Sequence, residues 1–163
     1  MYFSGHFAAP FIVSHYLKKD YKIAMAAGIF PDVVDKIGYY TLGITPDPHV
    51  PAHTFLGFFI SILFVWFIGK SSGKMWLFAQ SWTIGYGLHF ILDLLNGMIF
   101  FWWPFISYRL RPTHTIFENW AYSNKMAIIV TIIIEVIVTL SAFVIWYKKI
   151  HQNRECEVYH KNK

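Results

Sequence analysis

Two long apolar runs limit what this chain can fold into more than any other feature of its sequence. Residues 52–69 and residues 126–147 each have about the length, roughly 20 residues, that crosses the hydrocarbon core of a bilayer as a helix. Composition agrees, because 56% of the 163 residues are hydrophobic and 14% are charged, whereas about 25% are charged in soluble domains. The sequence therefore predicts an all-α, integral membrane helical bundle.

Three further apolar segments complete the predicted bundle. Residues 75–105 contain no Lys or Arg and exceed one crossing, so we expect their aromatic end to turn along the membrane surface. Residues 2–17 and 23–37 are shorter, which predicts an N-terminal helical hairpin that either crosses the bilayer or lies in its surface. We expect three long spans plus this hairpin, about five membrane segments, in one domain over residues 1–147, followed by a polar, basic and mobile tail over residues 148–163.

Basic residues are distributed unevenly between the two sides of this predicted bundle. Ten of the 14 Lys and Arg residues fall on one side, together with the C-terminal tail. Because cytoplasmic loops carry the excess of Lys and Arg, we expect an outside N-terminus and a cytoplasmic tail, in a cytoplasmic (inner) membrane. The net charge of +5 thus has an explanation in membrane orientation, and we predict no nucleic-acid partner. The single cysteine, Cys156, excludes a disulfide framework and a cysteine-rich metal site.

Several ionisable residues lie inside the predicted membrane segments. A charged group there is costly unless it faces a partner or a cavity, so each is a candidate for function. His89 and Asp93 are four residues apart and therefore adjacent on one helix face; Asp32 and Asp35 are three apart and follow a proline. The predicted metal ligands are His6, Asp32, Asp35, His53, His89 and Asp93.

These six residues are predicted to lie at one depth in the membrane. A rise of about 1.5 Å per residue places them about 15 to 25 Å from the basic side, in the outer half of the bilayer. Histidine nitrogens with carboxylate oxygens suit zinc, manganese or non-haem iron, and more than four ligands suit two ions about 3.5 to 4 Å apart. We therefore predict one or two divalent metal ions, zinc above all, with Asp35, His89 and Asp93 as catalytic residues and Asp35 as general base.

The same residues also have structural interpretations, which stay open at this point. His89 and Asp93 can form a buried hydrogen-bonded pair, and Asp35 can pair with Lys36 at the membrane surface. Glu135, in the middle of the last apolar run, is more typical of a buried packing residue that hydrogen-bonds within the bundle. His15 lies on the opposite side of its helix from His6 and is excluded from the site. A set of basic residues that can bind substrate, or only anchor to headgroups, is Arg109, Arg111 and His114.

The order of these motifs resembles the YdjM-like family of membrane-bound, metal-dependent hydrolases. The matching pieces lie within residues 5–105: Gly5-His6, the GIFPDVVDK of residues 28–36, His53-Thr54, the GYGLHFILD of residues 85–93, and Trp103-Pro104-Phe105. Many members carry a closer pair of acids and a fuller His-Arg-x-x-x-His-Ser element than this chain does. The family looks like a membrane relative of the zinc phospholipase C and P1 nuclease group, which implies phosphoester hydrolysis.

Two functions of different classes follow from the sequence. The first is a metal-dependent hydrolase in which metal-activated water attacks a phosphoester of a lipid or lipid-linked substrate at the outer membrane interface. The alternative is a non-catalytic membrane protein that relays or transports protons or metal ions, with Glu135 on its path. A third interpretation is a relative that has lost activity and binds metal only structurally.

Overall fold

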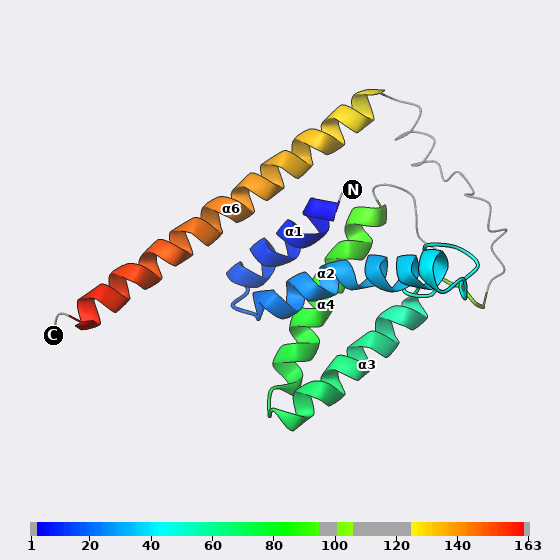
Figure 1. Ribbon diagram of the computed structural model, residues 1–163, viewed down its shortest axis with the longest axis horizontal. Coiled ribbons are helices and arrows are strands. Elements are labelled where there is room, and N and C mark those ends of the chain that lie inside the picture. The colour runs from blue at the N-terminus through cyan, green and yellow to red at the C-terminus, as the bar shows by residue number, and fades with distance from the viewer. Residues whose placement is uncertain (1–2, 95–100, 106–124, 162–163) are drawn as a thin grey trace.

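Every regular element in the described part of the chain is a helix. The computed structural model describes residues 3–94, 101–105 and 125–161, and it contains no strand within those ranges. The predicted all-α class is confirmed to that extent. The helical elements are α1 (Phe3–Tyr16), α2 (Tyr21–Lys36), the π-helical turn η1 (Ile37–Thr41), α3 (Phe55–Ser71), α4 (Met75–Leu94) and α6 (Lys125–Lys161) (Figure 1).

The helices pack around α4. It contacts α1, α2 and α3, whereas α6 packs along α1 at the edge of the bundle (Figure 1). Within the main core cluster, α4 supplies Trp82, Tyr86 and Phe90 against residues of α2 and α3. A second cluster joins α1 to α6 through Phe11 and Ala142.

Two capping residues set where helices α2 and α3 begin. The side chain of Asp20 accepts hydrogen bonds from the backbone N–H groups of Lys22 and Ile23 at 2.9 and 3.2 Å. The hydroxyl of Thr54 accepts one from the N–H of Gly57 at 3.0 Å. Both satisfy donors that the first turn of a helix leaves without partners. The α3 cap also fixes the position of the loop immediately before this helix.

The backbone of α2 approaches the backbones of α1 and α4 closely at two glycines, Gly28 of α2 and Gly85 of α4. A Cβ added at Gly28 would overlap the carbonyl oxygen of His6 in α1, and one added at Gly85 of α4 would overlap the carbonyl oxygen of Ala24 in α2. Small residues are what allow helix backbones to approach so closely. The consequence is that the rings of His6 and His89, from different helices, lie with their centroids 4.2 Å apart.

One described helix is long and apolar enough to cross a membrane. By length and composition it is the part of α6 over Ile129–Gln152, while Phe55–Ser71 (α3) is apolar but shorter. Many large apolar side chains of α3 and α6 are exposed to the surroundings of the bundle. Exposed apolar surface of this extent is typical of an interaction site or a membrane contact. The predicted arrangement of five membrane segments stays a prediction.

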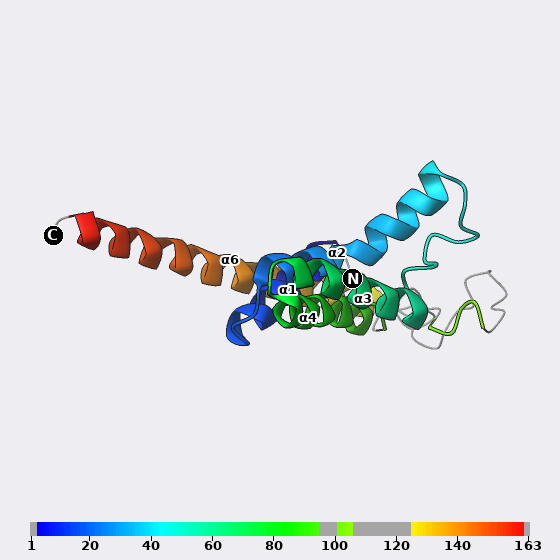
Figure 2. The ribbon, with the colours of Figure 1, turned by 90° about the horizontal axis from the view of Figure 1, so that it is seen from below.

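Some element boundaries differ from those expected. The apolar segment predicted over residues 75–105 is interrupted, since α4 ends at Leu94 and residues 101–105 form a turn whose Phe101 carbonyl accepts a hydrogen bond from the N–H of Phe55 at 3.0 Å. The segment predicted as a mobile tail continues α6 as helix to Lys161, because Lys, Gln, Arg and Glu are good helix formers. This end of α6 projects beyond the bundle (Figure 2).

Candidate metal centre

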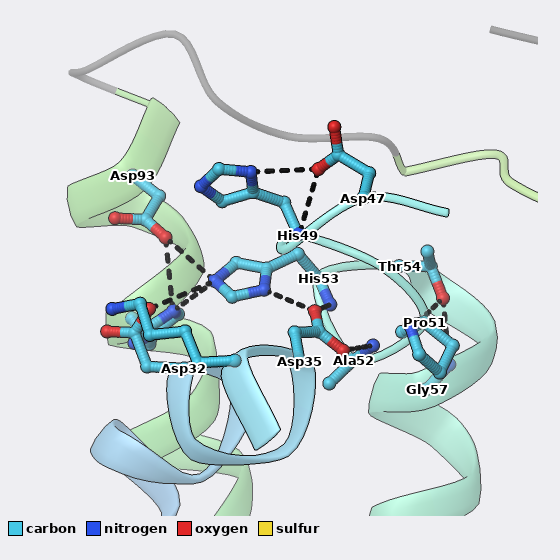
Figure 3. A network of polar contacts seen from close by, with 12 residues as sticks. Asp32, Asp35, Asp47, His49, Pro51, Ala52, His53, Thr54, Gly57 and Asp93 are labelled. Atoms are coloured by element: carbon cyan, nitrogen blue, oxygen red, sulfur yellow. Dashed lines mark hydrogen bonds and ion pairs between the residues drawn. The ribbon is translucent and has the colours of Figure 1, made fainter. Parts of the chain in front are cut away.

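Four segments of the chain meet at one end of the bundle. Helices α2 and α4 and the loop before α3 direct histidine or aspartate side chains into one buried network (Figure 3), and His6 of α1 joins this network through Asp93. The segments are far apart in sequence, so only the packing of the helices brings them together. All six residues predicted from the sequence belong to this network: His6, Asp32, Asp35, His53, His89 and Asp93.

Two imidazole nitrogens face each other at the centre of the network. The Nε2 atoms of His53 and His89 are 2.9 Å apart, and both rings are fully buried. The Nδ1 of His89 is 2.7 Å from the carbonyl oxygen of Gly28, and the Nδ1 of His53 is 2.7 Å from a carboxylate oxygen of Asp35. These oxygens accept hydrogen bonds, so both Nδ1 atoms carry hydrogen. In neutral rings the two facing Nε2 atoms are therefore both lone pairs, which repel unless a cation lies between them.

Carboxylate oxygens approach the same point. Oδ2 of Asp93 is 3.1 Å from Nε2 of His89 and 3.3 Å from Nε2 of His53. Oδ1 of Asp32 is 3.8 Å from Nε2 of His53. A tetrahedral zinc ion with bonds of about 2.0 to 2.2 Å separates its ligand atoms by about 3.3 Å. The group formed by Asp32, His53 and His89 therefore has the spacing that one divalent ion needs.

His6 adds a second group on the other side of Asp93. Its Nε2 is 3.1 Å from Oδ1 of Asp93, the oxygen that does not contact His53. His6 is 2% exposed, and its Nδ1 has no hydrogen-bond partner in the described part of the protein. A buried polar atom without a partner calls for an explanation such as an ion or a water molecule. His6, His89 and Asp93 form a second set of converging ligand atoms, which shares His89 with the first set. Because His89 has only Nε2 free, one ion uses it, and a second ion would be held by His6 and Oδ1 of Asp93.

Asp35 lies behind His53 instead of among the converging atoms. Its Oδ1 accepts a hydrogen bond from the N–H of Ala52 at 2.7 Å, and its Oδ2 accepts from the N–H of His53 at 3.1 Å as well as from the ring Nδ1. Three residues along a helix turn the side chain by about 300°, so Asp35 and Asp32 point about 60° apart. The geometry is that of a carboxylate that orients a metal-binding histidine, and it differs from the direct ligand and general base expected of Asp35.

Lys36 pairs with the other aspartate of α2. Its Nζ is 2.9 Å from Oδ1 of Asp32, and the lysine is half-exposed while Asp32 is mostly buried. The ion pair between Lys36 and Asp35 considered from the sequence is not the one formed here. Spacing explains the difference, because residues four apart face each other on a helix more closely than neighbours do. Asp32 thus sits between a surface cation and the buried imidazoles.

The protonation of His53 depends on its carboxylate neighbours. This residue stands in the loop before α3, and its two ring nitrogens lie 2.7 Å from Oδ2 of Asp35 and 3.3 Å from Oδ2 of Asp93, so a protonated ring can donate a hydrogen bond to each carboxylate. In the absence of a metal ion, a proton on His53 thus relieves the lone-pair repulsion with His89. A divalent ion has to displace that proton, because only a neutral imidazole ligates a metal.

An Asp–His pair that the sequence patterns did not indicate lies beside the network. Oδ1 of Asp47 accepts hydrogen bonds from the backbone N–H of His49 at 2.9 Å and lies 3.0 Å from its Nδ1, which holds the ring in place. The ring centroids of His49 and His53 are 5.6 Å apart, and His49 is partly exposed (Figure 3). A polar residue outside an apolar segment has no cost of membrane burial, so its presence in the sequence does not by itself indicate a function. The available signal was the TPDPH run of residues 45–49, just before His53.

Other residues considered from the sequence lie elsewhere. His15 is at the far end of α1, where it contacts Phe11 and Tyr16. Glu135 is buried in α6 and accepts hydrogen bonds from the hydroxyl of Ser4 at 2.5 Å and the N–H of Gly5 at 3.0 Å, so it caps the start of α1. The predicted substrate-binding residues fall outside the described residues: Arg109, Arg111 and His114.

No match to this chain was found among protein-family models, curated proteins or solved structures. Neither a fold nor an activity is therefore transferred from a relative. The ligand atoms, their spacing and their burial are the observations from which the chemistry of this site is inferred.

Proposed function

We propose that this protein is a membrane-associated, metal-dependent hydrolase that cleaves a phosphoester bond. The observation that carries the proposal is the pair of facing Nε2 atoms of His53 and His89, each with its hydrogen held on the opposite side of the ring. Two lone pairs aimed at one point, with Asp93 beside them, form a preorganised cation site. Zinc suits this donor set best, and manganese or iron would also be accepted.

Each residue of the network has a distinct task in this proposal. His53, His89, Asp93 and Asp32 bind the first ion, and His6 with the second oxygen of Asp93 adds either a further ligand or a second ion. A bound divalent ion lowers the pKa of water and polarises a phosphoryl oxygen. Asp35 is a positioning residue that keeps the lone pair of His53 directed at the ion.

His49 is the proposed proton acceptor. Asp35 is fully buried with both oxygens engaged, so it has no access to an attacking water. His49 is partly exposed beside His53, and Asp47 holds its Nδ1 hydrogen, which leaves Nε2 as the atom that accepts a proton. This division of roles replaces the one in which Asp35 was the base.

A lipid or lipid-linked phosphoester is the proposed substrate class. The exposed apolar faces of α3 and α6 support a membrane location, and the motif order resembles that of a membrane hydrolase family. We place the site in the outer half of the cytoplasmic membrane, with the N-terminus outside and the end of α6 in the cytoplasm. Transport of protons or metal ions ranks second, because Trp82, Tyr86 and Phe90 of α4 pack against α2 and α3 in an apolar cluster, which is not a polar path through the bundle.

Metal analysis with a phosphodiester assay tests the proposal. We expect the detergent-purified chain to hold one or two equivalents of zinc, manganese or iron and to hydrolyse bis(p-nitrophenyl) phosphate. The double variant His89→Ala, Asp93→Ala should lose both properties. His49→Gln should keep the metal and lose turnover, and His15→Ala, a histidine change at the far end of α1, should keep both.

The outcomes separate the candidate functions. A parent chain that contains no metal and binds none when it is added would refute the metal centre and leave a proton-held network. Full metal content without hydrolysis, together with uptake of labelled metal into proteoliposomes, would favour transport. Full metal stoichiometry in the His89→Ala, Asp93→Ala variant would show that the ion lies elsewhere.

A further inference from the structure

A hollow lies at the opposite end of α1 from the candidate metal centre. It is a cavity of about 550 Å³ between the end of α1 and the middle of α6. His15 and Tyr16 form its α1 side, and residues 140–152 of α6 supply the other side. Helix α6 runs beside α1 (Figure 1). None of the residues that line the hollow belongs to the candidate metal centre, so the hollow needs an explanation of its own.

One end of the hollow is positively charged. Lys148 and Lys149 line it together with Gln152, and the described lining residues include no acidic side chain. Nζ of Lys149 lies 4.1 Å from the centre of the ring of Tyr21, a residue beside the hollow that does not line it, in a cation–π contact. Within the described ranges neither lysine forms an ion pair, and the carboxylate of Asp20 is used as the cap of α2. The charge is therefore available to an anion.

The other end of the hollow is apolar and is continuous with the exposed face of α6. Leu140, Val144 and Ile145 form this wall. They belong to the apolar run that could cross a membrane, and the run gives way to charge at Lys148. Lysine, tryptophan and tyrosine side chains gather where a spanning helix meets the headgroup region. The hollow therefore has its charged end where a phospholipid in the adjoining leaflet has its headgroup, and its apolar wall where the lipid has its acyl chains.

We propose that this hollow binds an anionic membrane phospholipid, with the phosphate between Lys148 and Lys149 and the first carbons of an acyl chain along Leu140 and Val144. A lipid is favoured over a free anion because one ligand then satisfies both the charged end and the apolar wall. Anionic lipids attract each nearby lysine at the membrane surface by an amount that corresponds to several-fold in affinity. This inference concerns a separate site and does not depend on the metal centre.

Lipid binding by the purified full chain in detergent tests the inference. The probes are phosphatidylglycerol and phosphatidylcholine with matched acyl chains, and inorganic phosphate; the readouts are lipid adducts in native mass spectrometry and the shift in Tm. We expect phosphatidylglycerol to bind and raise Tm, and the double variant Lys148→Gln, Lys149→Gln to weaken this binding about tenfold or more. The matched control, Lys70→Gln with Lys74→Gln, removes the same charge from an exposed turn and should bind as the parent does.

A second variant keeps the test independent of net charge. Ser141→Trp fills the hollow without changing charge, and we expect it to weaken phosphatidylglycerol binding too. Equal binding of the two lipids by the parent, or equal loss in the Lys70 and Lys74 control, would overturn the inference. A Tm shift with inorganic phosphate that matches the lipid would identify the ligand as a free anion and overturn the lipid assignment.

Discussion

The direction of single side chains decides the chemistry of this site. Asp35 is the clearest case, because its two oxygens hold the Nδ1 hydrogen of His53 and two backbone N–H groups. An orienting carboxylate of this kind acts through the histidine that it contacts, and its removal typically costs about 10- to 100-fold in metal affinity. The same contact fixes which nitrogen of His53 is left for an ion.

Asp35→Asn should weaken metal binding about 10- to 100-fold while the chain still folds. In asparagine an NH2 group replaces one carboxylate oxygen. This group cannot accept a hydrogen bond, so the side chain cannot accept all three hydrogen bonds that Asp35 accepts. Titration of the purified variant with zinc, beside thermal unfolding, measures both effects. Asp20→Asn is the matched control, since asparagine caps a helix as well as aspartate does. Unchanged zinc affinity in Asp35→Asn would rule out the positioning role.

The packing of whole helices brings the ligands together. Helix α2 touches α1 at Gly28 and α4 at Gly85, and both contacts leave no room for a Cβ. Only this approach places the N-terminal end of α1 beside the C-terminal end of α4. The hydrogen bond from Nδ1 of His89 to the Gly28 carbonyl depends on it directly. The distance between the helices therefore determines how the candidate ligands are oriented.

Gly85→Ala should separate α2 from α4, lower the free energy of unfolding by about 1–3 kcal/mol and reduce metal binding. The added Cβ meets the carbonyl oxygen of Ala24, a backbone atom that cannot turn aside. Gly87→Ala, two residues along the same helix, meets nothing within 4 Å and should be neutral or stabilising. Thermal unfolding and zinc titration of the pair measure the difference, and equal behaviour of the two variants would contradict the packing account.

At the scale of the whole molecule the two ends of the bundle differ chemically. The candidate metal centre lies at one end, while the lysines of the α1–α2 turn and the α3–α4 turn, together with Lys148 and Lys149 of α6, lie toward the other. Buried carboxylates and imidazoles without a cation oppose folding, because their desolvation is compensated only by one another. A cation that binds the native state alone therefore stabilises the whole bundle.

Removal of the metal should lower the stability of the parent chain. An ion present at 100 times its Kd stabilises the native state by about 2.7 kcal/mol, so chelation should lower Tm by several degrees and added zinc should restore it. The His89→Ala, Asp93→Ala variant should show no response to either treatment. A metal-loaded parent whose Tm is the same with and without chelator would contradict a ligand role for this buried network.

Sequence patterns identified the candidate residues but not their individual tasks. The helical class follows from long apolar runs, and the six polar residues were recognisable because charge inside an apolar segment is costly. His49 carries no such signal, because a histidine in a Pro-rich loop has no such cost. The spacing of three residues between Asp32 and Asp35 indicates a shared helix face, but it does not indicate which oxygen points where.

Local residue chemistry and tertiary packing determine different features of this protein. Apolar content and helix propensity act residue by residue, so the amino-acid sequence alone decides that the chain is helical, that α6 is suited to a membrane and that histidines and aspartates occur in it. The facing Nε2 atoms of His53 and His89 and the hollow beside Lys148 and Lys149 exist only in the folded chain. Both join segments distant in sequence, and their geometry depends on how closely the helices approach.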